Sequence, residues 1–141
     1  RFSANYFLFE GGATFGRFGL RAGYEVLGGD SRPNRAFQTP LATLHAFNGW
    51  ADKFLTTPAG GMEDLSPGGS ASVGPGALQL VWHDYQAEAV DLDYGSEWNA
   101  SAAMKFGAKK SYEAMLKFAD YRADRFATDT TKVWVQVSAA F

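Results

Sequence analysis

The chain has 141 residues, of which 46% are hydrophobic and 16% aromatic, and its net charge is −2. This composition is too apolar for a disordered chain, suits one domain and offers no basic surface, so nucleic acid is not an expected partner. The absence of cysteine excludes disulfides and cysteine metal sites, and the absence of any apolar run of 18 residues excludes a membrane-spanning helix.

Two strands are predicted before residue 28. Phe2–Phe9 is expected to form the first, followed by a turn at Gly11, Gly12 and Gly16. Arg17–Leu27 alternates apolar residues with arginine, glycine and glutamate, which is the period of a strand with two different faces. Charges at alternate positions are costly toward lipid and natural toward water.

Residues 28–61 form a long predicted loop. Pro40–Phe47 is expected to contain a short helical turn that ends near Asn48. A loop of this length in a compact domain is usually functional. In a barrel it would fold into the mouth and narrow it; the alternative is that it packs against the inner wall without any gating role. The candidate constriction residues are His45, Asn48, Trp50, Asp52 and Lys53.

Five more strands are predicted after the loop. They are Met62–Val73, Ala77–Tyr85, Glu97–Phe106, Ser111–Tyr121 and Thr131–Phe141. Pro67 weakens the first of these, although a bulge would tolerate it. The last has one almost wholly apolar face and one mostly polar or small face, and its length suits a membrane-crossing strand of about 9–11 residues.

The connections alternate in length. They are short near 11–16, 74–76 and 107–110, and longer at 28–61, 86–95 and 122–130. Outer-membrane barrels have short periplasmic turns and longer outer loops. The sequence therefore predicts an all-β fold: residues 1–141 form a single antiparallel transmembrane β-barrel segment, with Phe141 at the periplasmic edge.

Seven strands are an odd number for a bacterial barrel, and an open sheet would expose edges that hydrocarbon does not tolerate. The chain is therefore expected to be the C-terminal part of a larger barrel; the alternative is that part of the loop region contains another strand. The absence of a signal peptide at Arg1 agrees with a mature or truncated chain.

Four stretches resemble the C-terminal part of alginate-export-type outer-membrane porins. They are Gly23–Asp30, Phe37–Leu65, Val81–Tyr85 and Leu116–Gln136. The most specific is Phe37–Leu65, which reads FQTPLATLHAFNGWADKFLTTPAGGMEDL. The resemblance implies an outer-membrane channel of a Gram-negative bacterium and a barrel larger than this chain; it does not establish alginate as the cargo.

The residues expected to line the lumen combine charges with aromatic rings. They are Arg17, Arg21, Glu25, Glu97, Lys105, Glu113, Lys117, Lys132, Tyr85, Tyr121 and Trp134. Five cations against three carboxylates predict a mildly positive wall that favours anionic solutes. The alternative is that these charges pair across strands and keep the lumen wet. The rings are expected either to stack on sugars or to fill space as girdle residues.

Metal and enzyme chemistry are not expected. The acidic outer loops have no recognised ligand spacing, so a solvated acidic surface is favoured over a Ca²⁺ site. His45 and Asp52 suggest catalysis only superficially, because no nucleophile motif, metal-ligand spacing or phosphate-binding loop accompanies them. No cofactor is predicted.

The expected location is the outer membrane. The expected partners are the lipid bilayer, lipopolysaccharide, the barrel assembly machinery acting through Phe141, and an anionic solute as candidate cargo. Two alternatives to a channel remain: a structural or interaction barrel with a blocked lumen, and a small soluble β-barrel that binds an apolar ligand inside. Solubility without detergent would favour the soluble barrel.

Overall fold

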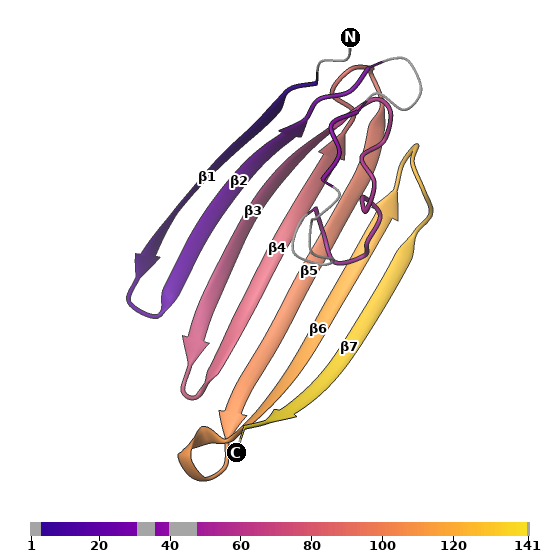
Figure 1. Ribbon diagram of the computed structural model, residues 1–141. Coiled ribbons are helices and arrows are strands. Elements are labelled where there is room, and N and C mark those ends of the chain that lie inside the picture. Colours follow the sequence, from indigo (N-terminus) through magenta and orange to yellow (C-terminus); the bar gives the residue numbers. More distant parts are fainter. Residues whose placement is uncertain (1–3, 31–35, 40–47, 141) are drawn as a thin grey trace.

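The computed structural model describes residues 4–30, 36–39 and 48–140. They form a single seven-stranded antiparallel sheet in which every strand pairs with its neighbour in sequence (Figure 1). The strands are β1 (Tyr6–Phe15), β2 (Phe18–Leu27), β3 (Met62–Val73), β4 (Gly76–Gln86), β5 (Asp93–Phe106), β6 (Tyr112–Ala123) and β7 (Thr130–Ala139). The predicted all-β antiparallel architecture is confirmed. Apart from a single-turn 3₁₀ helix, η1 (Ala108–Lys110), the described residues contain no helix.

The two ends of the sheet differ in the length of their connections (Figure 1). At one end β1–β2, β3–β4 and β5–β6 are joined by tight turns at residues 16–17, 74–75 and 107–111. At the other end lie the connections 28–61, 87–92 and 124–129. The predicted alternation of short and long connections is therefore confirmed, and each hairpin folds through a local turn, which fixes its register.

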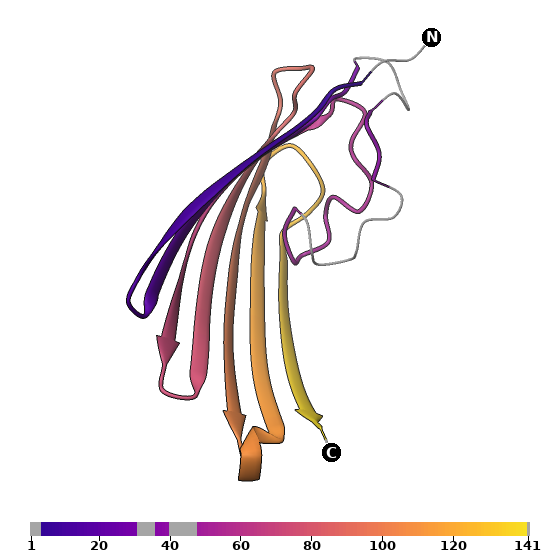
Figure 2. The ribbon, with the colours of Figure 1, turned by 60° about the vertical axis from the view of Figure 1, so that its left-hand side comes forward.

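The sheet is open in the described residues. β1 pairs with β2 alone and β7 with β6 alone, so the outer edges of both strands carry unpaired backbone groups. The strands twist together but do not close on themselves (Figure 2).

The first strand is displaced from its predicted position. It runs Tyr6–Phe15 rather than Phe2–Phe9, so Gly11 and Gly12 lie inside the strand and only Gly16, at φ 60°, supplies the turn. The two glycines were predicted as a turn on composition. Their backbones instead pair across the ladder with β2, because ladder hydrogen bonds need no side chain.

Pro67 does not interrupt its strand. Pro67 lies within β3 opposite Ala22, and the β3–β4 register is the same before and after it, so no bulge forms there. The ladder register shifts instead at Tyr85 and Gln86 of β4, where that strand pairs with β5. The predicted helical turn at 40–47 lies outside the described residues.

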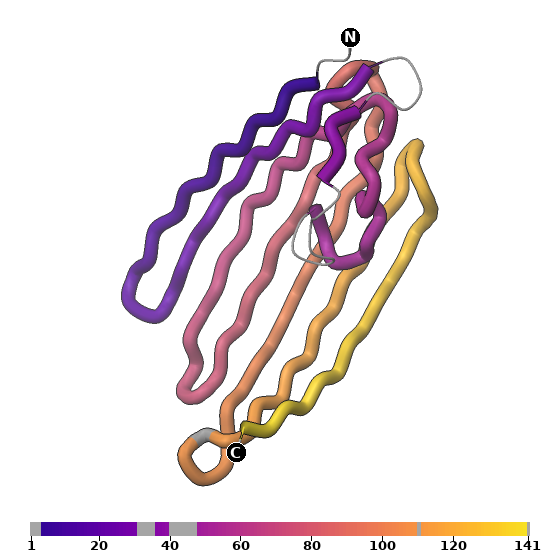
Figure 3. The backbone as a smooth tube through the Cα atoms, in the orientation of Figure 1, coloured from indigo at the N-terminus to yellow at the C-terminus, as the bar shows by residue number. Residues whose placement is uncertain are grey.

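The core does not lie between two sheets. It lies between the sheet and the long connection, which folds back beside one face of the sheet (Figures 2 and 3). Its buried members are Leu27, Ala51, Phe54, Met62, Tyr85, Tyr94, Ala119 and Tyr121. Residues of the connection and of five strands thus share one core, which holds the connection on the sheet.

Candidate functional site

The strand register places the polar residues of the sheet on one face. Gly12 of β1 is the ladder partner of Arg21, and Arg21 is also the partner of Gly68. In the same way Glu97 of β5 is the partner of both Tyr121 and His83. We call this the polar face. It carries Glu10, Arg21, Glu25, Asp64, Ser66, Ser70, Gln79, His83, Tyr85, Glu97, Asn99, Ser101, Lys105, Glu113, Lys117, Tyr121, Lys132, Trp134 and Gln136.

The opposite face, the apolar face, leaves large hydrophobic side chains exposed on all seven strands. They include Phe7, Phe9, Phe18, Leu20, Leu65, Val73, Leu78, Leu80, Leu116, Phe118, Val133, Val135 and Val137. Aromatic pairs lie at its two ends: Trp82 and Trp98, with ring centroids 6.4 Å apart, on the side of the long connections, and Phe106 stacked on Tyr112 at 5.5 Å near the short turns. Soluble proteins rarely expose a continuous apolar surface of this extent.

Segment 48–54 of the long connection crosses the polar face. It begins beside β2 and β3 and reaches β7. Three of its residues have positive φ, namely Asn48 (52°), Gly49 (88°) and Asp52 (61°). Asparagine, aspartate and glycine tolerate this backbone region best, so the local sequence permits the tight path.

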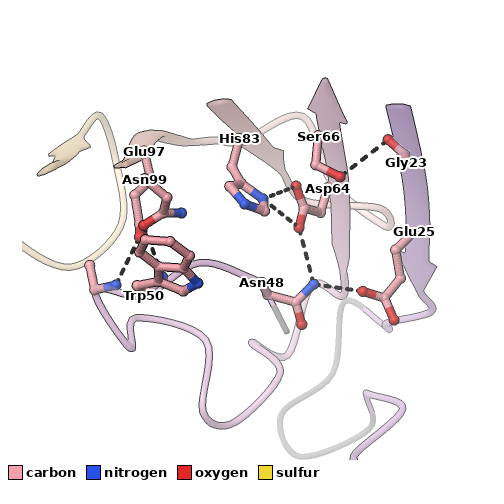
Figure 4. A network of polar contacts seen from close by, with 10 residues as sticks. Gly23, Glu25, Asn48, Trp50, Asp64, Ser66, His83, Glu97 and Asn99 are labelled. Atoms are coloured by element: carbon pink, nitrogen blue, oxygen red, sulfur yellow. Dashed lines mark hydrogen bonds and ion pairs between the residues drawn. The ribbon is translucent and has the colours of Figure 1, made fainter. Parts of the chain in front are cut away.

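Asn48 joins two facing carboxylates. Glu25 and Asp64 are direct partners in the β2–β3 ladder, where like charges repel. The Asn48 side-chain amide donates to Glu25 Oε2 at 2.7 Å and to Asp64 Oδ2 at 3.2 Å (Figure 4). One neutral donor group therefore stabilises both carboxylates and fixes the start of segment 48–54 to the sheet.

A buried histidine–aspartate pair lies next to this contact. His83 Nδ1 lies 2.9 Å from Asp64 Oδ1 and 3.0 Å from Oδ2 (Figure 4). The aspartate is 3% exposed and the histidine 8%. A buried carboxylate requires such partners, so His83 and Asn48 together satisfy Asp64.

Two acceptors from β5 bind the backbone of the segment. Glu97 Oε1 accepts a hydrogen bond from the Ala51 N–H at 2.8 Å, and Asn99 Oδ1 accepts one from the Trp50 N–H at 3.3 Å. Glu97 is 0% exposed. The segment therefore obtains its backbone partners from side chains of the sheet rather than from a helix or strand of its own.

Two lysines, from β6 and β7, bind residues 50 and 52 of the segment. Lys132 Nζ donates to Asp52 Oδ2 at 2.7 Å. Lys117 Nζ lies 4.1 Å from the centroid of the Trp50 ring and 5.4 Å from that of Trp134, which are cation–π distances. Both lysines were predicted to line a lumen; here they also hold the loop.

Phe54 ends the segment in an aromatic cluster. Its ring centroid lies 4.4 Å from Tyr85, 5.8 Å from Tyr94 and 5.3 Å from Phe126. The Tyr121 hydroxyl donates to the Phe126 carbonyl at 3.0 Å and to that of Tyr94. Because the rings are buried under the connection, Tyr85 and Tyr121 are not free to stack on a solute.

Two cavities lie beside the described residues of the polar face, one under segment 48–54 and one beyond it. One, of about 220 Å³, lies between residues 48–50 and strands β2, β4 and β5. The other, of about 300 Å³, lies over Gly12, Gly19, Gly69 and Ser70. Arg21 lines both.

Most of the predicted site residues therefore share the polar face, but not one site. Glu25, Glu97, Tyr85, Tyr121, Lys117, Lys132 and Trp134 lie under or beside segment 48–54, and Lys53 Nζ lies 5.6 Å from the Tyr121 ring centroid. Lys105 and Glu113 form a separate pair at 3.8 Å near the short turns. Arg17 lies in a turn against the Phe18 ring. His45 and Phe141 lie outside the described residues.

The predicted net positive charge of this wall is not found. On its strands lie Arg21, Lys105, Lys117 and Lys132 against Glu10, Glu25, Asp64, Glu97 and Glu113. The prediction counted Arg17, which lies in a turn. It left out Glu10, which lies beyond the predicted first strand, and Asp64, which was not assigned to this face.

Sequence reasoning also missed Asp64, His83 and Asn99 as members of the site. Each has the correct strand parity, so the alternation contained the signal that they share the face of Glu25 and Glu97. The contacts of Asp64 with Asn48 and of Asn99 with Trp50 were not predictable, because they involve a loop without periodicity. The contact of His83 with Asp64 joins two strands, and it depends on the register of β3 against β4.

Comparison of the chain with protein-family models, curated proteins and solved structures finds no match. The resemblance to alginate-export-type porins therefore stays a prediction. Among the described residues, no cluster of histidine and carboxylate side chains suits a metal ion. Nor does any described helix have the length and apolar character to cross a membrane.

Proposed function

We propose that this chain forms part of the wall of an outer-membrane β-barrel channel, with the apolar face in lipid and the polar face toward the lumen. The observation that carries the proposal is the exposed apolar face, which extends over all seven strands while the opposite face is polar. Outer-membrane barrels have this alternation.

The dimensions of the apolar face support the proposal. From Trp98 to Phe106 along β5 the strand spans about 26 Å at ~3.3 Å per residue, which is about 20 Å along the membrane normal at the ~40° tilt of barrel strands. The apolar band of outer-membrane barrels is about 25 Å tall and is bordered by aromatic girdles. Trp82 with Trp98 and Phe106 with Tyr112 are the corresponding rings of this chain.

A channel of this kind requires more strands than the seven described here. Unpaired backbone groups are not tolerated in hydrocarbon, so the edges of β1 and β7 must pair with further strands to close a barrel. We propose that the sheet is one part of a larger barrel, in agreement with the porin resemblance.

If the polar face lines the lumen, the long connection narrows that lumen. Segment 48–54 lies on the polar face, fixed at both ends by Asn48 and Asp52. The glycine and serine side of the polar face, over β1 to β3, leaves open volume beside it. Small polar solutes are therefore the proposed cargo, because the passage beside the segment is narrow and the wall has no large excess of either charge.

One observation also favours a barrel whose lumen is blocked. The connection buries Tyr85, Tyr121 and Glu97 of the polar face, as a plug would. This structural or interaction barrel is the second candidate function. It differs from the channel in one measurable property, because it does not conduct ions.

Two measurements test the channel proposal. The native membrane fraction is compared on a gel with and without boiling, and a folded barrel is expected to shift in mobility. The purified protein is then added to planar bilayers, where discrete ion conductance is expected. A shift without conductance would support the blocked barrel, and recovery of the protein in the soluble fraction would contradict both functions.

A further inference from the structure

We propose that the 220 Å³ cavity between segment 48–54 and the sheet binds a small carboxylate-bearing solute, held by Arg21 and Asn99. The inference deepens the proposed channel function by giving the passage a solute site. It rests on that function for its role in transport, whereas binding itself requires no pore.

The cavity is lined by side chains from three strands and the loop. Its lining residues are Arg21, Asn48, Gly49, Trp50, Gln79, Val81, His83 and Asn99. Most of this lining is polar, and no carboxylate contributes to it. A ligand in this cavity would contact amide, imidazole and guanidinium groups and the indole ring of Trp50.

Arg21 supplies a solvent-exposed positive charge without an ion-pair partner among the described residues. In the described part of the chain no carboxylate or aromatic ring pairs with its guanidinium, whereas Lys105, Lys117 and Lys132 each have a partner. Its ladder neighbours on both sides are Gly12 and Gly68, which have no side chain to cover it. A Cβ at position 68 would lie 3.0 Å from the Leu80 carbonyl oxygen and from Val81 Cγ2 and 3.4 Å from Arg21 Cγ, so a larger residue would crowd the surface beside the arginine.

Asn99 supplies a donor without an acceptor at the base of the cavity. The residue is 1% exposed, and its Oδ1 accepts the Trp50 N–H. Its Nδ2 has no hydrogen-bond partner among the described residues, and Figure 4 shows this nitrogen on the side of Asn99 that faces His83. A buried amide donor without a partner is costly, and a ligand oxygen would satisfy it.

The two groups together select a carboxylate. Guanidinium recognises planar carboxylate oxygens with two donors, and an amide N–H adds a third. The neighbouring carboxylates Glu25 and Asp64 are engaged by Asn48 and His83 rather than by the cavity. The volume equals that of roughly seven water molecules at ~30 Å³ each, so a small acid fits and a polymer chain does not.

The test is calorimetric titration of the detergent-purified protein with propionate and with propionamide, its uncharged isostere. Saturable binding of propionate in the millimolar range is expected, with propionamide at least about tenfold weaker because it lacks the charge. Arg21→Gln should weaken propionate binding about tenfold or more. Asn99→Asp should do the same, since it keeps the acceptor for Trp50 N–H and replaces the amide donor by a carboxylate.

The matched control is Lys105→Gln, which removes another cation of the polar face near the short turns and should leave the affinity unchanged. Equal binding of the two probes, no saturable heat, or wild-type affinity in a folded Arg21→Gln protein would overturn the proposal. Propionate binding without conductance would refute the channel and keep the site. Conductance without propionate binding would refute the site and keep the channel.

Discussion

At the residue scale, the polar face is held together by hydrogen bonds to buried carboxylates. Asp64 pairs with His83 Nδ1 and accepts a hydrogen bond from the Asn48 amide, and Glu97 accepts one from the Ala51 N–H. A buried carboxylate that loses its partners, or partners that lose their carboxylate, destabilise a protein strongly. Exposed pairs on the same face, such as Lys105 with Glu113, contribute little.

Asp64→Ala should therefore lower the free energy of unfolding by about 3 kcal/mol, because it leaves the buried His83 without its carboxylate partner and removes one of the two acceptors of Asn48. Urea unfolding in detergent micelles measures this change. Glu113→Ala, which removes the more exposed pair with Lys105, should cost less than about 1 kcal/mol. Equal losses in the two variants would contradict the role assigned to Asp64.

Gly49 is the residue whose size controls how closely the loop approaches the sheet. A Cβ at this position would lie 2.2 Å from the Tyr85 hydroxyl and 2.5 Å from Glu97 Oε2, and its φ is 88°. Gly49→Ala should shift the loop toward an undocked state by about 2 kcal/mol, from backbone strain and overlap.

Trypsin cleavage after Lys53 reports this undocking, and it should be at least about tenfold faster in Gly49→Ala, since 1.4 kcal/mol is a tenfold change. Gly11→Ala is the control, because nothing lies within 4 Å of its Cβ position. The same cleavage rate in both variants would show that the close approach does not hold the loop.

At the element scale, two hydrogen bonds between Gln38 and Thr57 join the two ends of the long connection, and we call this pair the neck. The Gln38 side chain donates to the Thr57 carbonyl at 3.0 Å and accepts from the Thr57 N–H at 3.2 Å. The part between these residues can therefore be removed while the neck stays paired. The strands on either side, β2 and β3, keep their own ladder.

Replacing residues 39–56 by a short glycine–serine linker should raise single-channel conductance, because segment 48–54 no longer covers the polar face. Planar-bilayer recording measures this. Replacing the turn 87–92 by a glycine–serine turn of equal length is the control and should leave conductance near that of the unaltered protein. Unchanged conductance after the 39–56 excision would mean that this loop does not narrow the passage.

Most strands were predictable from the alternation of apolar and polar residues, whereas the site was not, because its contacts join residues that are distant in the chain. Alternation places β3 at Met62–Val73, as predicted, in spite of Pro67, because the period-two pattern survives one missing donor. The contact of Asn48 with Glu25 and Asp64 has no sequence pattern, since its residues are distant in the chain and one lies in an aperiodic loop. Gly11 and Gly12 misled the placement of β1 because composition cannot distinguish a glycine in a turn from one in a ladder.

At the scale of the whole molecule, the sheet separates its residues into one face for an apolar environment and one for water. Adjacent residues of β7 illustrate this separation: Val135 lies on the apolar face at 78% exposure, and Gln136 lies on the polar face. The proposed function depends on this orientation relative to the bilayer more than on any single contact.

The measurement that tests it most directly compares Val135→Arg with Gln136→Arg for folding into lipid vesicles under urea titration. An arginine facing lipid near the midplane should cost about 2–4 kcal/mol of folding free energy, and one facing the lumen less than about 1 kcal/mol. That result would place the apolar face in the bilayer. Equal tolerance of both arginines, or a larger cost at Gln136, would contradict the assignment of the two faces.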